Sequence, residues 1–201
     1  MSAMSGTNMQ QPQLHMIWPS GRTITPTDLQ VKAPYFIRRY RPGDEQSFLA
    51  LMAISDFDCW DDRKLAFNIA RTIPDGWFFA VDTGEQSVAG TGLCLHNYCG
   101  NAPFTGDVGW IFCAPRHRGH GLGYALTANV VSQFVQAGYS RIQLQTESHR
   151  LAAIKIYLKL GFIPLLGSPV AHSQWTEACR QVNWPFSPET WASTAGLSRK
   201  A

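Results

Sequence analysis

Glycines and cations are concentrated in one short stretch of the chain, between an apolar segment and an amphipathic one. The stretch reads Arg116-His117-Arg118-Gly119-His120-Gly121-Leu122-Gly123-Tyr124. Its three glycines permit a tight turn that exposes backbone N–H groups, and the free N–H groups and positive dipole end of the following helix point to the same place. The pattern therefore predicts an anion-binding loop, and a diphosphate is the group that suits it.

Spacing distinguishes three kinds of anion-binding loop. A mononucleotide P-loop needs Lys followed by Ser or Thr after the glycines, and no such pair follows them here. A dinucleotide loop needs Gly-x-Gly-x-x-Gly with an acidic residue about 20 residues later. In this chain the glycines run Gly-x-Gly-x-Gly, and Glu147 lies about 24 residues past Gly123. The spacing that fits is Arg/Gln-x-x-Gly-x-Gly, which begins at Arg118.

A second motif follows one helix and one strand later, as Ala-x-x-x-Tyr-x-x-x-Gly-Phe. It consists of Ala153, Tyr157, Gly161 and Phe162. With both motifs in this order and at this separation, the chain resembles the GNAT superfamily of acyl-CoA acetyltransferases. The resemblance covers roughly residues 35 to 166, and the two segments outside it are not explained by it.

The resemblance implies acetyl-CoA as co-substrate, bound mainly by backbone groups. The loop N–H groups would hold the pyrophosphate, two arginines would add charge-assisted hydrogen bonds, and the preceding strand would pair with the pantetheine arm and polarise the thioester carbonyl. Arg150 stands where the family often has Asn, and it is included as a candidate cofactor contact. The predicted cofactor-binding residues are Ile111, Phe112, Cys113, Arg116, Arg118, Gly119, His120, Gly121, Leu122, Gly123, Tyr124 and Arg150.

Catalysis would need a proton donor for the departing thiolate and a proton acceptor for the attacking amine. Tyr157 occupies the family's usual general-acid position, although an aromatic residue on a buried helix face would be placed in the same way. Asp107, Glu147 and His149 are alternative bases, each of which could equally be a surface or cap residue, and ordered water could carry the proton instead. Gln145 stands where ribosomal-protein N-terminal acetyltransferases carry a glutamate base, so a small-molecule acceptor is favoured over a protein N-terminus.

Composition agrees with one compact enzyme domain. The chain has 201 residues, a net charge of +3 and 45% hydrophobic residues, and it has no basic stripe typical of a nucleic-acid binder. No apolar run reaches the ~18 residues that span a bilayer, and the start of the chain does not resemble a signal peptide. The five cysteines form no Cys-x-x-Cys pair, so we expect reduced thiols, a cytoplasmic location and no metal.

Hydrophobic periodicity predicts an α/β chain with six strands and four helices in the order β-α-α-β-β-β-α-β-α-β. The resemblance implies how they assemble: a mixed, largely antiparallel sheet of six to seven strands, flanked by about four helices. By resemblance, the sheet is splayed between its fourth and fifth strands. Residues 1–33 are read as an N-terminal tail, 34–167 as the acyltransferase domain, and 168–201 as a C-terminal extension with one helix from Ala171 to Val182. That extension would cover a substrate cleft or form the arm of a homodimer.

These observations favour an enzyme that moves an acetyl group from acetyl-CoA to a primary amine by direct attack in a ternary complex. A non-catalytic acyl-CoA sensor and a nucleotide-binding α/β domain are the alternatives. The acceptor is not defined, because early helices and variable loops form its pocket.

Overall fold

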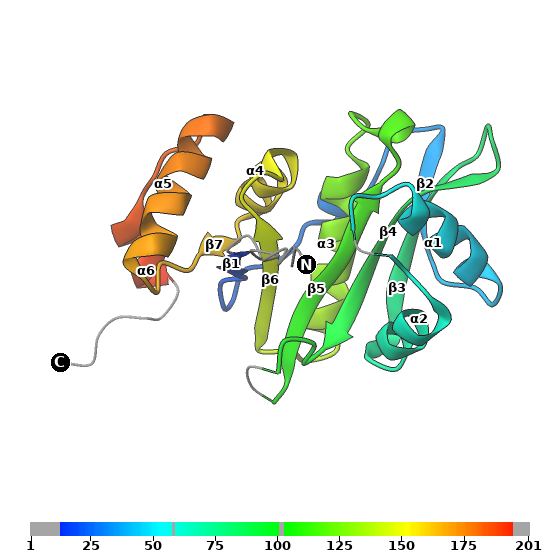
Figure 1. Cartoon of the computed structure of the whole chain (residues 1–201), viewed down its shortest axis with the longest axis horizontal. Helices are drawn as coiled ribbons and strands as arrows, with labels where there is room; N and C mark the ends of the chain where they lie inside the picture. Colours follow the sequence, from blue (N-terminus) through cyan, green and yellow to red (C-terminus); the bar gives the residue numbers. More distant parts are fainter. Residues whose placement is uncertain (1–12, 58, 101–102, 195–201) are drawn as a thin grey trace, which may run out of the picture.

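A seven-stranded sheet organises the molecule. The computed structural model describes residues 13–57, 59–100 and 103–194. In space the strands follow the order β2-β3-β4-β5-β6-β1-β7 (Figure 1), with β5 and β6 parallel and every other neighbouring pair antiparallel. The strands are β1 (Gln13–Ile17), β2 (Tyr35–Arg39), β3 (Thr72–Asp82), β4 (Ser87–His96), β5 (Thr105–Cys113), β6 (Arg141–Glu147) and β7 (Ile163–Pro164).

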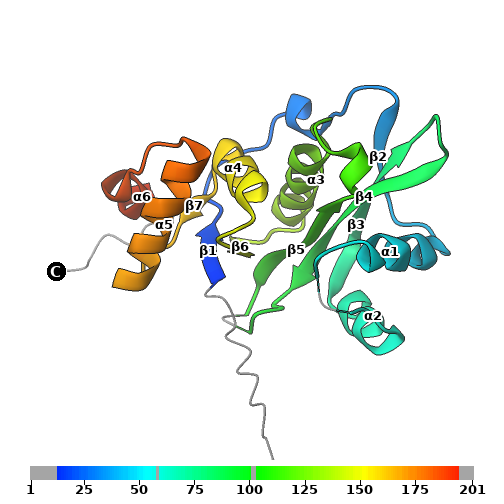
Figure 2. The ribbon, with the colours of Figure 1, turned by 45° about the horizontal axis from the view of Figure 1, so that its top comes forward.

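Helices cover both faces of the sheet, and each face has its own apolar core. Figure 2 shows α3 and α4 on the opposite side of the sheet from α1 and α2. The helices are α1 (Asp44–Ala53), α2 (Asp62–Ile69), α3 (Leu122–Gln136), α4 (Leu151–Leu160), α5 (Pro169–Val182) and α6 (Pro188–Thr194), with 3-10 turns η1 (Pro26–Leu29) and η2 (Pro115–His117). The mixed α/β sheet expected from the sequence is confirmed, and no described helix is long and apolar enough to cross a membrane.

Strands β5 and β6 separate soon after they begin, which confirms the expected splay. Their parallel ladder contains only three residue pairs, from Thr105↔Arg141 to Asp107↔Gln143. Beyond that point β5 continues to Cys113 on β4, while β6 continues to Glu147 on β1. The two diverging strands therefore leave a gap between their carboxyl ends.

The prediction of a tail over residues 1–33 is wrong for the part that the structure describes. Gln13–Ile17 forms β1, which lies between β6 and β7 and pairs with β6 along its whole length. Leu14 and Met16 are buried in the core while Gln13 and His15 are exposed, so the strand alternates as a half-buried strand should. The strand has only five residues and lies within a polar segment, so its alternation of apolar and polar residues is too short to be recognised in the sequence. Residues 1–12 lie outside the described residues.

The C-terminal extension also packs against the domain. Helix α5 begins at Pro169 and contacts α4 and β1. Its N-cap is Ser168, whose hydroxyl oxygen accepts a hydrogen bond from the N–H of Ala171. Trp175 on this helix is completely buried. The helix expected here is confirmed.

A bidentate ion pair fixes helix α1 to strand β2. Both guanidinium nitrogens of Arg38 donate to the Asp44 carboxylate, at 2.6 and 2.8 Å, and the Arg41 N–H donates to it at 2.7 Å. The Arg38 hydrogen bonds hold the pKa of Asp44 below its ordinary value despite partial burial. The ion pair thereby holds α1, and with it the start of the segment that joins α1 to α2, in place beside β2.

Truncation of Met16 will show whether β1 is part of the core. Met16→Ala should lower the free energy of unfolding by about 2–5 kcal/mol, because its side chain is completely buried. His15→Ala, on the exposed face of the same strand, should change it by less than about 0.5 kcal/mol. Urea unfolding of both variants checks this, and equal effects would show that β1 does not contribute its buried face to the core.

The Arg38–Asp44 pair should make stability depend on acid pH. Because the folded-state pKa of Asp44 is depressed, its contribution is present above the ordinary value of about 3.9 and is lost as pH falls below it. Asp44→Asn should therefore cost about 2 kcal/mol at pH 7 and much less at pH 3. Urea unfolding at both pH values is the measurement, with Asp62→Asn as the exposed control. A pH-independent cost would contradict the assignment.

Candidate active site

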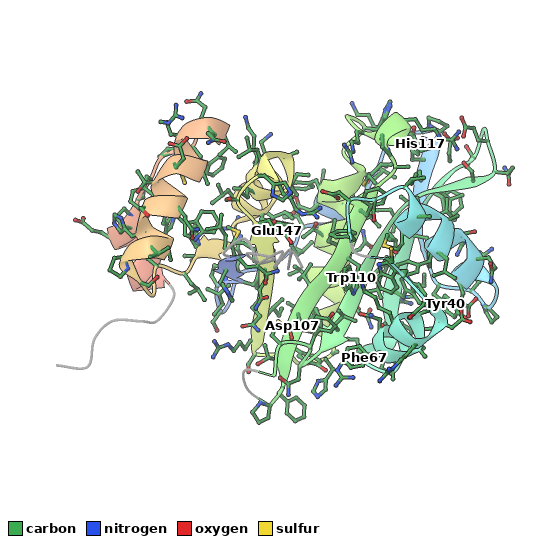
Figure 3. The ribbon with its side chains drawn as sticks, in the orientation of Figure 1. Tyr40, Phe67, Asp107, Trp110, His117 and Glu147 are labelled. Atoms are coloured by element: carbon green, nitrogen blue, oxygen red, sulfur yellow. The ribbon has the colours of Figure 1, made fainter. Side chains whose placement is uncertain are left out.

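A cleft of about 1230 Å³ occupies the gap between β5 and β6. In Figure 3, Asp107 and Trp110 on β5 and Glu147 at the end of β6 border this region. Most predicted site residues line the cleft: Asp107, Ile111, Phe112, Cys113, Arg118, Gly119, Gly121, Leu122, Gly123, Tyr124, Glu147, His149, Arg150 and Tyr157. The structure thus brings the two sequence motifs to a single cavity.

One end of the cleft is the glycine loop that joins η2 to α3. Gly119 and Gly121 have φ angles of +86° and +78°, which L side chains rarely adopt. Gly121 is the N-cap of α3 and offers no side-chain cap; the first helical hydrogen bond runs from the Ala125 N–H to the Gly121 carbonyl, at 3.1 Å. The N–H groups of residues 122–124 therefore have no partner inside the helix and are available to an anion.

Three cationic side chains line the cleft near this loop. Arg118 extends along β5, where its Nε donates to the Cys113 carbonyl at 3.4 Å. Lys155 and Lys159 lie one turn apart on α4. Arg116 does not line the cleft: it is exposed and pairs with Glu85 at 2.8 Å.

His120 also lies outside the main cleft. It borders a smaller hollow on the other side of the loop, where its ring lies 5.1 Å from that of Tyr35. Of the cofactor-binding residues expected from the sequence, Arg116 and His120 are therefore the two whose side chains do not line this cavity.

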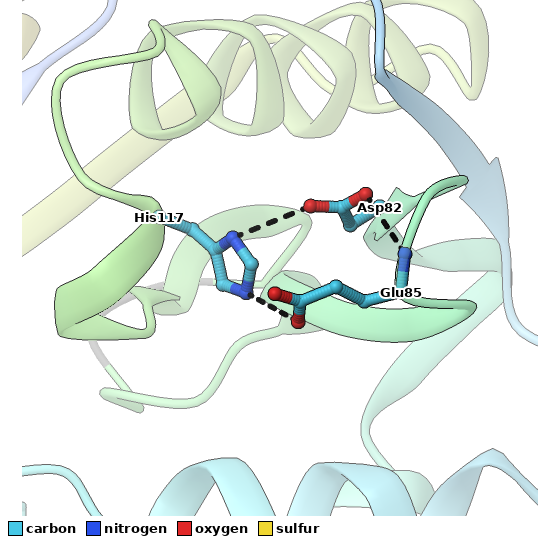
Figure 4. Close-up of side chains that lie close together, drawn as sticks. All are labelled: Asp82, Glu85 and His117. Carbon is cyan, nitrogen blue, oxygen red and sulfur yellow. Dashed lines mark hydrogen bonds and ion pairs between the residues drawn. The ribbon is translucent and has the colours of Figure 1, made fainter.

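Behind the loop, His117 connects η2 to the β3–β4 turn. Its Nδ1 lies 3.0 Å from the Tyr35 hydroxyl and 3.7 Å from Asp82, while Nε2 lies 3.9 Å from Glu85 (Figure 4). His117 is 3% exposed. Ligand atoms of this trio fall within 4.8 Å of one another, but the carboxylates face different ring nitrogens and Glu85 also binds Arg116. The geometry favours a tether for the loop over a shared metal ion.

Strand β5 contains a bulge next to the cleft. Between the pairs Thr91↔Phe112 and Leu93↔Gly109, β5 has one residue more than β4. Trp110 in this bulge has a φ of +51°, a strained value for a non-glycine residue. Its indole N–H donates to the Asn68 side chain at 2.6 Å. The bulge turns Trp110 toward the α1–α2 side while Ile111 packs against the α3 side.

Tyr157 lies on α4 and lines the cleft, although only 7% of its surface is exposed to solvent. Burial raises the pKa of its phenol above the ordinary value of about 10, and Arg150 nearby counteracts this only in part. The hydroxyl is consequently protonated throughout the neutral range and can donate a proton or a hydrogen bond.

The three candidate bases differ in how their acceptor atoms are used. Asp107 is 4% exposed; one carboxylate oxygen accepts from Gln143 at 2.7 Å, and the other from the N–H groups of Tyr98 and Cys99 at 2.8 and 3.4 Å. These bonds hold the turn after β4. Asp107 is thus engaged in structural hydrogen bonds, which leaves it poorly placed to accept a proton.

Glu147 and His149 belong to an ion-pair cluster at the cleft mouth. Arg150 donates to Glu147 at 2.5 Å and to Asp56 at 3.0 Å, so that it ties β6 and α4 to the segment between α1 and α2. His149 has Nε2 3.8 Å from the Asp56 carboxylate and an imidazole that is 55% exposed. Arg150 also lies over the ring of Phe57, 4.3 Å from its centroid. Arg150 therefore performs a structural task at the mouth.

Two thiols in the cleft are kept protonated. Burial raises the pKa of Cys113 to about 12, and burial together with Asp107 raises that of Cys99 to about 12. A thiolate is the nucleophilic form of cysteine. Neither residue is therefore poised to accept an acyl group.

Several cleft residues escaped the sequence analysis: Gln13, Asp56, Phe57, Tyr98, Trp110, Lys155 and Lys159. Lys155 and Lys159 lie four residues apart and share one face of α4, but each is two residues from Tyr157, so the motif gave no signal for them. Gln13 depends on the unrecognised strand β1. The others come from turns and a bulge, whose positions carry no periodic signal.

Residues 40–162 match the model of the acetyltransferase (GNAT) family. Among curated proteins, the mycothiol acetyltransferase of Pseudarthrobacter chlorophenolicus is 27% identical over 157 residues, covering 73% of this chain and 49% of that protein. The corresponding protein of Salinispora tropica is 27% identical over 172 residues, covering 80% and 56%. The chain spans about half the length of these curated relatives.

Solved structures support the fold. A GCN5-related N-acetyltransferase from Sphaerobacter thermophilus superposes with a TM-score of 0.60 at 20% identity, covering 76% of this chain and 48% of that one. At such identity the likeness concerns the fold alone.

Substitution of Gly121 tests the anion-binding loop. Gly121→Val forces a branched side chain into a left-handed conformation and displaces the adjacent N–H groups, so acetyl-CoA, the diphosphate compound implied by the resemblance, should bind at least ~10-fold more weakly. Gly138→Val is the matched control, because Gly138 at the end of α3 has a φ of +80° and equally open surroundings. Isothermal titration measures both, and equal affinity of the two variants would refute the assignment.

Proposed function

Because the chain belongs to the GNAT acetyltransferase family, we propose that it transfers an acetyl group from acetyl-CoA to a primary amine. One observation carries the proposal: a single cleft joins the unpaired N–H groups of the glycine loop, the open edge of β5 and the hydroxyl-bearing Tyr157. These are the groups needed to hold a diphosphate, to extend a strand and to donate a proton.

The residues present fit acetyl-CoA. The N–H groups of residues 119–124 would bind the pyrophosphate, with charge from Arg118, Lys155 and Lys159. The ladder between β5 and β6 ends at Asp107, so the β5 backbone from residue 111 to 113 faces the cleft without a partner strand. A pantetheine amide can pair with such an edge in the way that a peptide adds to a sheet.

In the proposed reaction an amine nitrogen attacks the thioester carbonyl carbon. A C–N bond forms, the C–S bond breaks, and the proton lost by the amine balances the proton gained by the thiolate. A backbone N–H of β5 stabilises the negative oxygen that develops. Binding both reactants in one cleft lowers the barrier by alignment alone.

We assign Tyr157 as the proton donor to the departing sulfur, because its raised pKa keeps the phenol protonated. We assign His149 as the first proton acceptor. His149 lines the cleft beside Asp56, its imidazole is 55% exposed, and a neutral imidazole has a ring nitrogen that can accept a proton. Asp107 and Glu147 are already occupied by hydrogen bonds and by Arg150, respectively.

Direct attack is favoured over an acyl-enzyme intermediate. The two cysteines that line the cleft have raised pKa values and lack thiolate character at neutral pH. All five cysteines are free thiols, which supports a reducing compartment, and we propose the cytoplasm. A homodimer remains a prediction.

Calorimetric titration with acetyl-CoA, with NAD and ATP as controls, is the primary test of cofactor identity. Micromolar binding of acetyl-CoA alone would support the proposal. Release of free thiol that depends on an added amine then separates an enzyme from a sensor that only binds acyl-CoA. Tight binding without amine-dependent thiol release would favour the sensor, and preferential binding of NAD or ATP would contradict the acyltransferase assignment.

Removal of one hydroxyl tests the proton donor. Tyr157→Phe should lower kcat by about 100-fold, the usual contribution of a positioned acid, and leave acetyl-CoA affinity unchanged. Tyr139→Phe is the matched control: it also removes a phenolic hydroxyl, which in this case is hydrogen-bonded to His96, but Tyr139 lies outside the cleft. Full activity of Tyr157→Phe would exclude Tyr157 as the proton donor to the departing sulfur.

A further inference from the structure

The front of the cleft has an aromatic wall, defined here as Phe57, Tyr98 and Trp110, all of which line the cavity. Trp110 is central: Phe57 meets it edge-on with ring centroids 5.2 Å apart, and Tyr98 does so at 6.2 Å. The three residues come from the segment after α1, the turn after β4 and the bulge of β5. Three separate parts of the chain thus converge on one apolar surface.

Trp110, the centre of the aromatic wall, is rigidly held. Trp110 has a strained backbone and is fixed by its hydrogen bond to Asn68, which is itself buried. On the side away from the cleft, Trp60 packs against it at 4.7 Å and Lys64 lies 5.2 Å from its ring centroid. Strain of this kind persists only where the surroundings impose it and is concentrated at ligand-binding sites. The wall is therefore preorganised to receive a flat group.

The charges at the mouth favour a cation. Two carboxylates, Asp56 and Glu147, share the single guanidinium of Arg150. The cluster formed by these three groups carries one net negative charge, and the lysines that line the cleft lie on α4, where the proposed cofactor site is. An ammonium group entering here is attracted before it loses its proton.

Resting on the proposed function, we infer that the acceptor is a primary amine carried by an aromatic or similarly flat apolar body that has no anionic group. The body stacks on the aromatic wall, and the amine points to the thioester between β5 and β6. Aromatic faces and edges prefer such partners and also attract a nearby ammonium.

A polyhydroxylated amine fits this surface poorly. Each buried hydroxyl needs a hydrogen-bond partner, and Asp107, the most buried of the acidic residues that line the cleft, already accepts three hydrogen bonds. The amide groups of Gln13 and Gln145 line the cleft from β1 and β6, across the gap from Trp110 on β5. The acceptor of this chain therefore differs in chemistry from an amino sugar.

A panel of amines tests the inference. Initial rates of thiol release are measured at saturating acetyl-CoA with 2-phenylethylamine, tryptamine, putrescine and glucosamine. The aromatic amines should have kcat/KM values at least about 10-fold above those of putrescine and glucosamine. In parallel, titration of the protein saturated with CoA should show 2-phenylethylamine binding more tightly than glucosamine, a comparison that needs no turnover.

Variants connect the preference to the wall. Tyr98 is 36% exposed, so Tyr98→Ala leaves the core intact. It should lower kcat/KM for 2-phenylethylamine about 5-fold, mainly through KM, with unchanged affinity for acetyl-CoA. Phe36→Ala is the matched control, because Phe36 is an aromatic residue of similar exposure, 40%, on β2 and away from the cleft. It should change neither parameter.

The outcomes separate the two proposals. Turnover of glucosamine or putrescine equal to that of the aromatic amines would overturn this inference and leave the acetyltransferase intact. Binding of 2-phenylethylamine to the CoA complex no tighter than glucosamine would likewise overturn it. Absence of acetyl-CoA binding would instead refute the proposed function, and the acceptor inference with it.

Discussion

The separation of β5 from β6 after three residue pairs is the constraint on which the site depends. A parallel ladder that continued would satisfy the backbone of both strands and leave no room for a ligand. Here β5 stays paired with β4 and β6 with β1 on their outer sides, so beyond Asp107 and Gln143 each strand keeps an open edge toward the gap. The bulge at Trp110 and the bonds of Asp107 to the turn after β4 stabilise the divergence on the β5 side.

Around this gap the two ends of the cleft are built on different physical principles. The glycine loop offers backbone N–H groups and nearby cations, which suit an anion and make few demands on side-chain shape. The mouth offers aromatic rings and an excess of carboxylate over guanidinium, which suit an apolar cation. A compound containing both a diphosphate and a thioester can therefore enter from one side while an amine enters from the other.

Sequence reasoning succeeded where local rules act and failed where tertiary context decides. The loop at Gly119 and Gly121 requires positive φ angles, and α4 ends at Gly161 in the left-handed region, so both could be predicted from residue types alone. Strand β1 could not be predicted, because these five residues form a strand only through pairing with β6, which is distant in the sequence. The position of Asp56 beside Arg150 and the strained turn of Trp110 likewise arise only once separate elements meet.

Strand β1 also has a consequence for the order in which the molecule assembles. Gln13 pairs with Glu147, so β1 finds its partner only after most of the sheet has been synthesised. The meander from β2 to β5 needs no such delay, since its strands pair with their sequence neighbours. Folding should therefore complete the meander before β6 and β1 join it. The cleft would then lie between the part of the sheet that folds first, β2 to β5, and the part that folds later, β6 and β1.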